Sequence, residues 1–89
     1  MSATRTTLVL DPRDNVAVAL RQLDPGDVVE DGVVAAASIP TEHKVARAPI
    51  AAGDAVVKYG EVIGVATAAI ATGEHVHVHN VVSARLPGT

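Results

Sequence analysis

Short apolar stretches alternate with turn-forming residues along the chain. Asp-Pro, Pro-Gly, Asp-Gly and Gly-Asp pairs interrupt the sequence repeatedly, and most valines stand beside Ala, Gly or a polar residue. Because β-branched side chains pack well on a pleated surface, this pattern favours short strands joined by tight turns. Residues 14–23 are the exception, since Asp14 or Asn15 would cap a short helix there, but residues 16–20 fit a strand equally well and we favour the strand. We therefore expect an all-β fold with at most one short helix.

One turn pattern occurs three times. It consists of an apolar residue, two variable residues, a glycine, an acid, one further residue and a valine, and it covers residues 23–29, 50–56 and 70–76 with small variations. Each glycine can supply the positive φ of a tight turn, after which a strand begins. The three copies either share a common origin or are a frequent turn that leads into a strand. Both interpretations predict a sheet of short strands folded on itself.

Composition limits what the chain can do alone. It has 89 residues and a net charge of −3, with sixteen Ala, sixteen Val, one Tyr and no Phe, Trp or Cys. A domain this short buries roughly 60–65% of its unfolded surface, so we do not expect a self-sufficient enzyme with a deep pocket of its own. Without cysteine, disulfides, thiol catalysis and thiolate zinc sites are excluded. The mild acidity argues against nucleic acid as a partner.

The two ends and the apolar stretches indicate where the protein acts. The first seven residues lack the apolar core of a secretory signal. The longest largely apolar stretch, residues 62–71, is shorter than the roughly 20 residues that a membrane-spanning helix needs. We therefore expect a cytoplasmic protein with no membrane partner, made of a single domain over residues 1–89.

Histidines alternate with other residues near the end of the chain. On a strand over residues 74–82, His75, His77 and His79 would lie on one face, roughly 6.5–7 Å apart from one to the next. Two imidazoles at that spacing can converge on one ion, whereas all three would need a bulge or strong curvature. We favour a metal or anionic ligand on one pair, either His75 with His77 or His77 with His79, over an ordinary polar face. Imidazole ligands favour Zn, Fe, Mn or Cu, and a second chain would complete the site.

Two further segments carry chemically useful side chains. His43 and Lys44 follow a proline turn, where His43 could act as a base and Lys44 could hold a carboxylate. Lys58 and Tyr59 place a cation beside the single aromatic residue. On local grounds alone the simpler interpretation of both segments is structural: an exposed polar turn in the first, and a packed Tyr59 beside a solvated Lys58 in the second.

Taken together, these blocks resemble a known family. In order and spacing they are similar to the small N-terminal SAF domain of the altronate and galactarate dehydratase family, and the (2R)-sulfolactate sulfo-lyase alpha subunit looks like the same module made as a separate chain. The resemblance covers roughly residues 8–82. It rests on four blocks: Asp11-Pro12-x-Asp14-Asn15-Val16-Ala17, Ile39-Pro40-x-x-His43-Lys44-Val45-Ala46, Lys58-Tyr59-Gly60-x-x-Ile63-Gly64 and Gly73-Glu74-His75-Val76-His77-Val78-His79-Asn80.

The resemblance implies a β-clip-type SAF fold and a metal-assisted lyase. In the family, a much larger module supplies most of the active site, and water or sulfite is removed from a hydroxy or sugar acid by β-elimination. The chain would then be the small subunit of an enzyme with a separately encoded large dehydratase-like subunit, and inactive alone. One departure is Glu42, where the family usually has Gly before His-Lys, a change that affects the turn aiming both side chains.

The resemblance also implies roles for individual residues. The cofactor would be a divalent ion such as Fe, Mn or Zn. The acid would be held by Lys44, Lys58 and Tyr59, a proton would be transferred by His43, and the metal ligands would be His75, His77 and His79.

Two other functions remain open from the sequence. The chain could be a stand-alone SAF module that binds a sugar acid or another protein without catalysis, or a β domain in which a metal has only a structural role. The sequence leaves open whether the chain forms a homo-oligomer, and it does not identify the acid, the leaving group or the metal.

Overall fold

Nine short strands make up the fold. A computed structural model describes residues 5–83, and none of these residues forms a helix, so the all-β prediction is confirmed and residues 16–19 form a strand. Within this described part, no helix is long and apolar enough to cross a membrane. The strands are β1 (Thr7–Leu8), β2 (Val16–Ala19), β3 (Val28–Glu30), β4 (Val33–Val34), β5 (Lys44–Ala46), β6 (Ala55–Lys58), β7 (Glu61–Ala66), β8 (His75–Val76) and β9 (Val81–Ser83).

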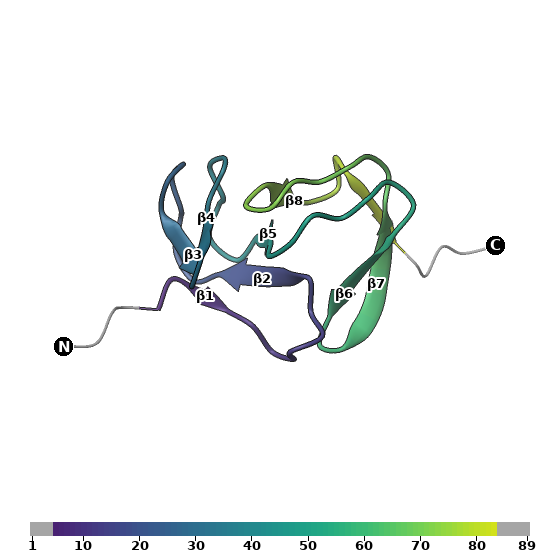
Figure 1. Cartoon of the computed structure of the whole chain (residues 1–89), viewed down its shortest axis with the longest axis horizontal. Helices are drawn as coiled ribbons and strands as arrows, with labels where there is room; N and C mark the ends of the chain where they lie inside the picture. Colours follow the sequence, from purple (N-terminus) through teal and green to yellow (C-terminus); the bar gives the residue numbers. More distant parts are fainter. Residues whose placement is uncertain (1–4, 84–89) are drawn as a thin grey trace.

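The strands form three small antiparallel sheets. The central sheet has the order β1-β2-β5-β8, a hairpin of β3 and β4 forms the second sheet, and β6-β7-β9 form the third. The β3–β4 hairpin lies toward one end of the molecule and the β6–β7 hairpin toward the other, with β2 and β5 between them (Figure 1). The central sheet is therefore covered by packed residues on both sides.

Two hydrophobic clusters fill the space on either side of the central sheet. Residues of β2 alternate between them, with Ala17 and Ala19 in one cluster and Val16 in the other. Neighbouring strand residues point to opposite faces, so a strand covered on both sides is apolar at nearly every position. The first cluster contains Val16, Ala46, Ile50, Val56, Ala66, Ile70 and Val76. The second contains Ala17, Ala19, Leu23, Val29, Ala35, Ile39 and Val45.

The three predicted turns are present, and a fourth joins them. The glycines of the predicted copies have φ values of 93°, 88° and 86°, as a tight turn of this kind requires. Residues 39–45 form a fourth copy in which Glu42, at φ 71°, occupies the glycine position. In all four copies the N–H after this position donates to the carbonyl three residues earlier, at 3.0 Å; the pairs are Asp27 to Asp24, His43 to Pro40, Asp54 to Ala51 and Glu74 to Ala71.

The four turns relate two similar halves of the chain. The first residues of the copies pair with one another, Leu23 with Ile39 and Ile50 with Ile70. The N–H at the fourth position of each turn also repeats its partner. Gly26 donates to Ala35 as Gly53 donates to Ala66, and Glu42 donates to Ala19 as Gly73 donates to Ala46. The fold is thus a duplicated unit. In the fourth copy, His43 stands where the other three have an acid.

Candidate metal centre

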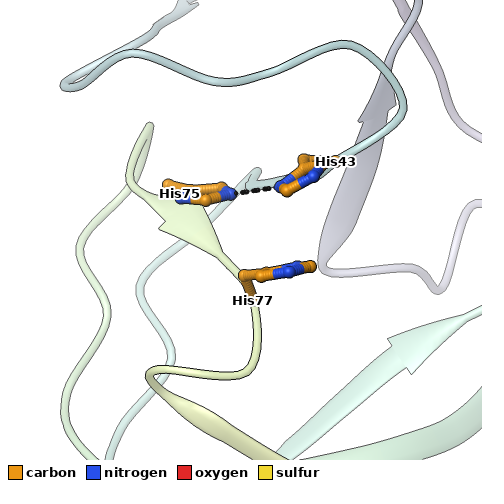
Figure 2. A group of neighbouring side chains, drawn as sticks. All are labelled: His43, His75 and His77. Carbon is orange, nitrogen blue, oxygen red and sulfur yellow. Dashed lines mark hydrogen bonds between the residues drawn. The ribbon is translucent and has the colours of Figure 1, made fainter.

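Three histidines from two distant segments meet at one edge of the central sheet. His43 immediately precedes β5, His75 begins β8 and His77 follows β8. The antiparallel register aligns Val45 with His75 and Lys44 with Val76. One step further in the same register, His43 lies beside His77. One ligand nitrogen of each histidine lies within 4.8 Å of the other two (Figure 2). We call His43, His75 and His77 the histidine cluster.

The rings of the histidine cluster lie nearly parallel. The His43 and His77 centroids are 4.1 Å apart, and the His75 and His77 planes differ by 11°. Nδ1 of His43 lies 2.7 Å from Nε2 of His75, so one of these nitrogens donates a hydrogen bond to the other. The accepting nitrogen carries no proton, but its lone pair is engaged by this bond, so binding a metal ion through both nitrogens requires the shared proton to leave.

The continuous strand expected over residues 74–82 is wrong. β8 ends at Val76, the chain turns at residues 77–80, and β9 begins at Val81. The Asn80 side chain holds this turn, because its Oδ1 accepts the His77 N–H at 3.0 Å and its Nδ2 donates to the His75 carbonyl at 2.9 Å. The turn carries His79 on its exposed side, with its ring 5.2 Å from that of His75.

Burial and neighbouring charge lower the pKa of two members of the histidine cluster, His75 and His77. Burial lowers the pKa of His75, and the charges on His43, His79, His77 and Lys44 lower it further. Desolvation also lowers the pKa of His77, followed by the charges on His43, Lys44 and His79. A neutral imidazole is the form that binds metal ions, so these shifts favour a ligand role near neutral pH.

The predicted acid-binding residues lie in two places: Lys44 is beside the histidine cluster, and Lys58 and Tyr59 are where β6 turns into β7. Lys44 is half-buried and lines a groove of about 200 Å³ together with His77 and Ile63. Burial lowers the pKa of Lys44, and the charge of Lys58 lowers it further. Among the described residues, neither lysine forms an ion pair.

Tyr59 contradicts the local interpretation of its segment. Its side chain is 62% exposed, whereas that of Lys58 is half-buried, so the expectation of a packed tyrosine beside a solvated lysine is wrong. The reason is the turn between β6 and β7, in which Tyr59 has a φ of 58° and projects outward. Nζ of Lys58 lies 5.3 Å from the Tyr59 ring centroid, so the two side chains nevertheless lie on the same side of the turn.

The donor atoms of the histidine cluster fit a transition-metal ion. Two imidazoles bound at about 2.0–2.1 Å in a tetrahedral site have their nitrogens about 3.3 Å apart. The 2.7 Å between the His43 and His75 nitrogens is shorter, so binding requires these two rings to separate by about half an ångström. Three neutral imidazoles suit Zn, Fe, Mn or Cu better than Ca or Mg. They leave further coordination positions for a substrate.

Sequence reasoning placed His43 in a separate role and gave no function to Asn80. The missed signal for His43 is the fourth turn copy, which aligns His43 with Glu74 one residue before His75. Asn80 lies within the same motif as the histidines, but its two hydrogen bonds depend on the chain turning back at residue 78. The alternation of histidines at positions 75, 77 and 79 fits a regular strand and gives no sign of this turn.

The fold and the site define a class of protein: a small all-β domain with a duplicated turn and a histidine cluster. The family model for the altronate/galactarate dehydratase SAF domain matches residues 5–84. The chain therefore belongs to this SAF domain family.

Three curated relatives show how the domain occurs elsewhere. The chain is 35% identical over 79 residues to an altronate dehydratase of Bacillus subtilis (strain 168), covering 85% of this chain and 16% of that protein. It is 47% identical over 70 residues to an altronate dehydratase of Escherichia coli (strain K12), covering 75% of this chain and 14% of that protein. It is 48% identical over 48 residues to the (2R)-sulfolactate sulfo-lyase subunit alpha of Paracoccus pantotrophus, covering 54% of this chain and 72% of that subunit. The chain thus spans only a small part of the dehydratases that it matches.

Proposed function

We propose that this domain is the small component of a lyase that β-eliminates water, or sulfite, from a hydroxy or sugar acid. The observation that carries the proposal is the histidine cluster, which pairing of β5 with β8 assembles in a domain of a dehydratase family. Relatives named altronate dehydratase, galactarate dehydratase and sulfolactate sulfo-lyase support this class of reaction. The lack of cysteine is in keeping with action in a reducing cytoplasm.

His43, His75 and His77 are proposed to hold a divalent ion such as Fe, Mn or Zn. This changes the set expected from the sequence, because His43 replaces His79 in the cluster whose nitrogens lie within 4.8 Å. When bound, such an ion would stabilise the negative charge that develops on the acid as its proton leaves. The lowered pKa values of His75 and His77 favour the neutral form that this role requires.

Lys44 and Lys58 are proposed to bind the carboxylate of the acid. Lys44 lines the groove beside His77, the charge of Lys58 acts on Lys44, and within the described residues neither lysine has a carboxylate partner in an ion pair. A carboxylate placed between them would relieve the repulsion between two ammonium groups and would gain charge-assisted hydrogen bonds. Tyr59, exposed beside Lys58, is proposed to contact a hydroxyl group of the same acid.

The elimination requires one proton to leave carbon and one to reach the departing group. The proton next to the carboxylate passes to a base, its bonding pair forms the carbon–carbon double bond, and the hydroxyl departs with its own pair and a proton as water. We propose His79 for proton transfer in place of His43, because the exposed imidazole of His79 lies 5.2 Å from the His75 ring and reaches solvent. In the sulfo-lyase reaction the leaving group is sulfite.

A larger dehydratase-like subunit is proposed to complete the site. The groove beside Lys44 is open and small, at about 200 Å³, and it does not enclose a sugar acid by itself. In the altronate dehydratases that the chain matches, the matching region is 14–16% of the protein, so most of the active site can come from the remainder. The chain alone is therefore expected to be inactive.

The test is reconstitution with the product of a neighbouring gene for a large dehydratase-like chain. The mixture is assayed with altronate, galactarate and (2R)-sulfolactate, and its metal content is measured. His77→Ala should lose both metal and activity, whereas His79→Ala should retain metal while losing activity. Full metal content and full activity with His77→Ala would overturn the metal assignment. Acid binding by the chain, with no activity beside any large subunit, would favour a binding module instead.

A further inference from the structure

Asp14 is a buried carboxylate that the proposed reaction does not use. Its side chain is 5% exposed, and among the described residues it forms no ion pair. Its two oxygens instead accept backbone hydrogen bonds from residues far along the chain, Oδ2 from the Tyr59 N–H at 3.1 Å and Oδ1 from the Gly60 N–H at 2.8 Å. Burying a carboxylate is unfavourable unless such donors replace water, so both bonds are needed to keep it there.

The two donors are the central residues of the turn between β6 and β7. Tyr59 and Gly60 have φ values of 58° and 71°, the left-handed pair of a two-residue hairpin turn. Glycine adopts this conformation readily and a tyrosine does so rarely. Because the Tyr59 side chain is 62% exposed, packing does not hold it there. The Asp14 carboxylate accepts the N–H groups of both central residues, in addition to the pairing of Lys58 with Glu61 that closes the turn.

Asn15, the next residue, forms hydrogen bonds with the backbone of strand β6. Its Nδ2 donates to the Ala55 carbonyl at 2.9 Å, and its Oδ1 accepts the Val57 N–H at 2.8 Å. The Asn15 N–H also donates to the Val57 carbonyl at 3.2 Å. Lys58 lies between Val57 and Tyr59, so its backbone is fixed on both sides by two consecutive residues of one loop.

We propose that Asp14, assisted by Asn15, is a positioning residue that holds Lys58 and Tyr59 where they meet the acid. Nζ of Lys58 lies over the Tyr59 ring, 5.3 Å from its centroid, and this arrangement depends on the turn whose N–H groups Asp14 accepts. This role for the acid-binding residues rests on the proposed function. The hold on the turn does not, because it follows from the hydrogen bonds alone.

The test is Asp14→Asn, with Asp31→Asn as the matched control. The amide keeps the size of the carboxylate but offers one acceptor oxygen, and its NH₂ group faces a backbone N–H. Asp31 undergoes the same chemical change at an exposed position in the turn between β3 and β4. In the complete chain, amide hydrogen exchange of Tyr59 and Gly60 should become at least about tenfold faster in Asp14→Asn, with other amides within about twofold. Asp31→Asn should leave both amides unchanged.

The kinetic measurement separates positioning from a purely structural role. In the reconstituted lyase, Asp14→Asn should raise KM for the acid about tenfold or more while kcat stays within about threefold. Uniformly faster exchange at all amides, or a loosened turn with unchanged KM, would overturn the proposal. If the wild-type chain shows no activity with any large subunit, the proposed function fails, and amide exchange still decides whether Asp14 holds the turn.

A second variant keeps the test decisive if Asp14→Asn does not fold. Tyr59→Gly places a residue at the turn that adopts a positive φ without support, so Asp14→Asn combined with Tyr59→Gly should fold. Compared with Tyr59→Gly alone, the double variant should still show a higher KM, because the backbone next to Lys58 is no longer fixed by the Asp14 carboxylate. Equal KM values in these two variants would refute the positioning role.

Discussion

Replacing Glu42 by glycine should stabilise the domain. Glu42 has a φ of 71° at the turn position where the other three copies have glycine at 93°, 88° and 86°. Its N–H donates to the Ala19 carbonyl at 2.7 Å, which keeps the backbone in this conformation. The side chain is exposed, and none of the hydrogen bonds or ion pairs found in residues 5–83 involves it. Removing the side chain therefore loses little and relieves a strained backbone.

The expected gain is the difference between two backbone effects. A non-glycine residue in the left-handed region costs about 1–2 kcal/mol. Glycine has greater freedom in the unfolded chain, which costs about 0.5–1 kcal/mol when the domain folds. The difference spans about 0–1.5 kcal/mol, with a central value of about 0.75 kcal/mol of net stabilisation. For a domain of this size, that central value raises the melting temperature by about 3–6 °C.

Thermal and urea unfolding of the complete chain measure this gain. Glu61→Gly is the matched control, because it makes the same chemical change at an exposed position in strand β7, where it should destabilise by about 0.5–1 kcal/mol. Gly53→Ala is the reverse change at an equivalent turn with open space around the added carbon, and it should destabilise as well. An unchanged or lower stability for Glu42→Gly would refute the strain at this turn.

Two further predictions concern the histidine cluster. Asn80→Ala removes both side-chain hydrogen bonds of the turn at residues 77–80 and should lower the free energy of unfolding by about 1–3 kcal/mol; an unchanged urea midpoint would contradict this. Because burial lowers the pKa of His75 in the folded state, the unfolded chain binds more protons between that lowered pKa and the ordinary value of 6.5. Stability of the metal-free chain should therefore rise with pH through this interval and fall on acidification. Urea midpoints measured from pH 5 to 7.5 should show a smaller slope for His75→Gln, and an identical slope would count against this origin.

Much of the fold could be predicted from the sequence because particular residue types mark its turns. Glycine followed by an acid marked three turns, and all three glycines have the positive φ that was expected. The fourth copy was hidden, since Glu42 and His43 replace the glycine and the acid that define the pattern. Its conformation is held by tertiary contacts, such as the hydrogen bond to Ala19, that no local pattern reveals.

The site was only partly predictable for the same reason. Alternation drew attention to His75 and His77, whose rings the structure brings together, but it also predicted a strand that the Asn80 side chain interrupts. The approach of His43 depends on the register between β5 and β8, which joins residues 32 positions apart. The contacts of Asp14 with the turn at Tyr59 are equally long-range, so the sequence showed a recognisable block there without showing its role.

The most direct test of the central claim is a metal titration observed at the histidine rings. The metal-free chain is titrated with Zn²⁺, and the ring nitrogens of its four histidines are followed by ¹⁵N NMR. If His43, His75 and His77 hold the ion, one nitrogen of each moves to a metal-bound shift at one equivalent of Zn²⁺, while His79 is unchanged. Unchanged shifts for the histidine cluster at one equivalent, or binding by His75, His77 and His79 without His43, would contradict it.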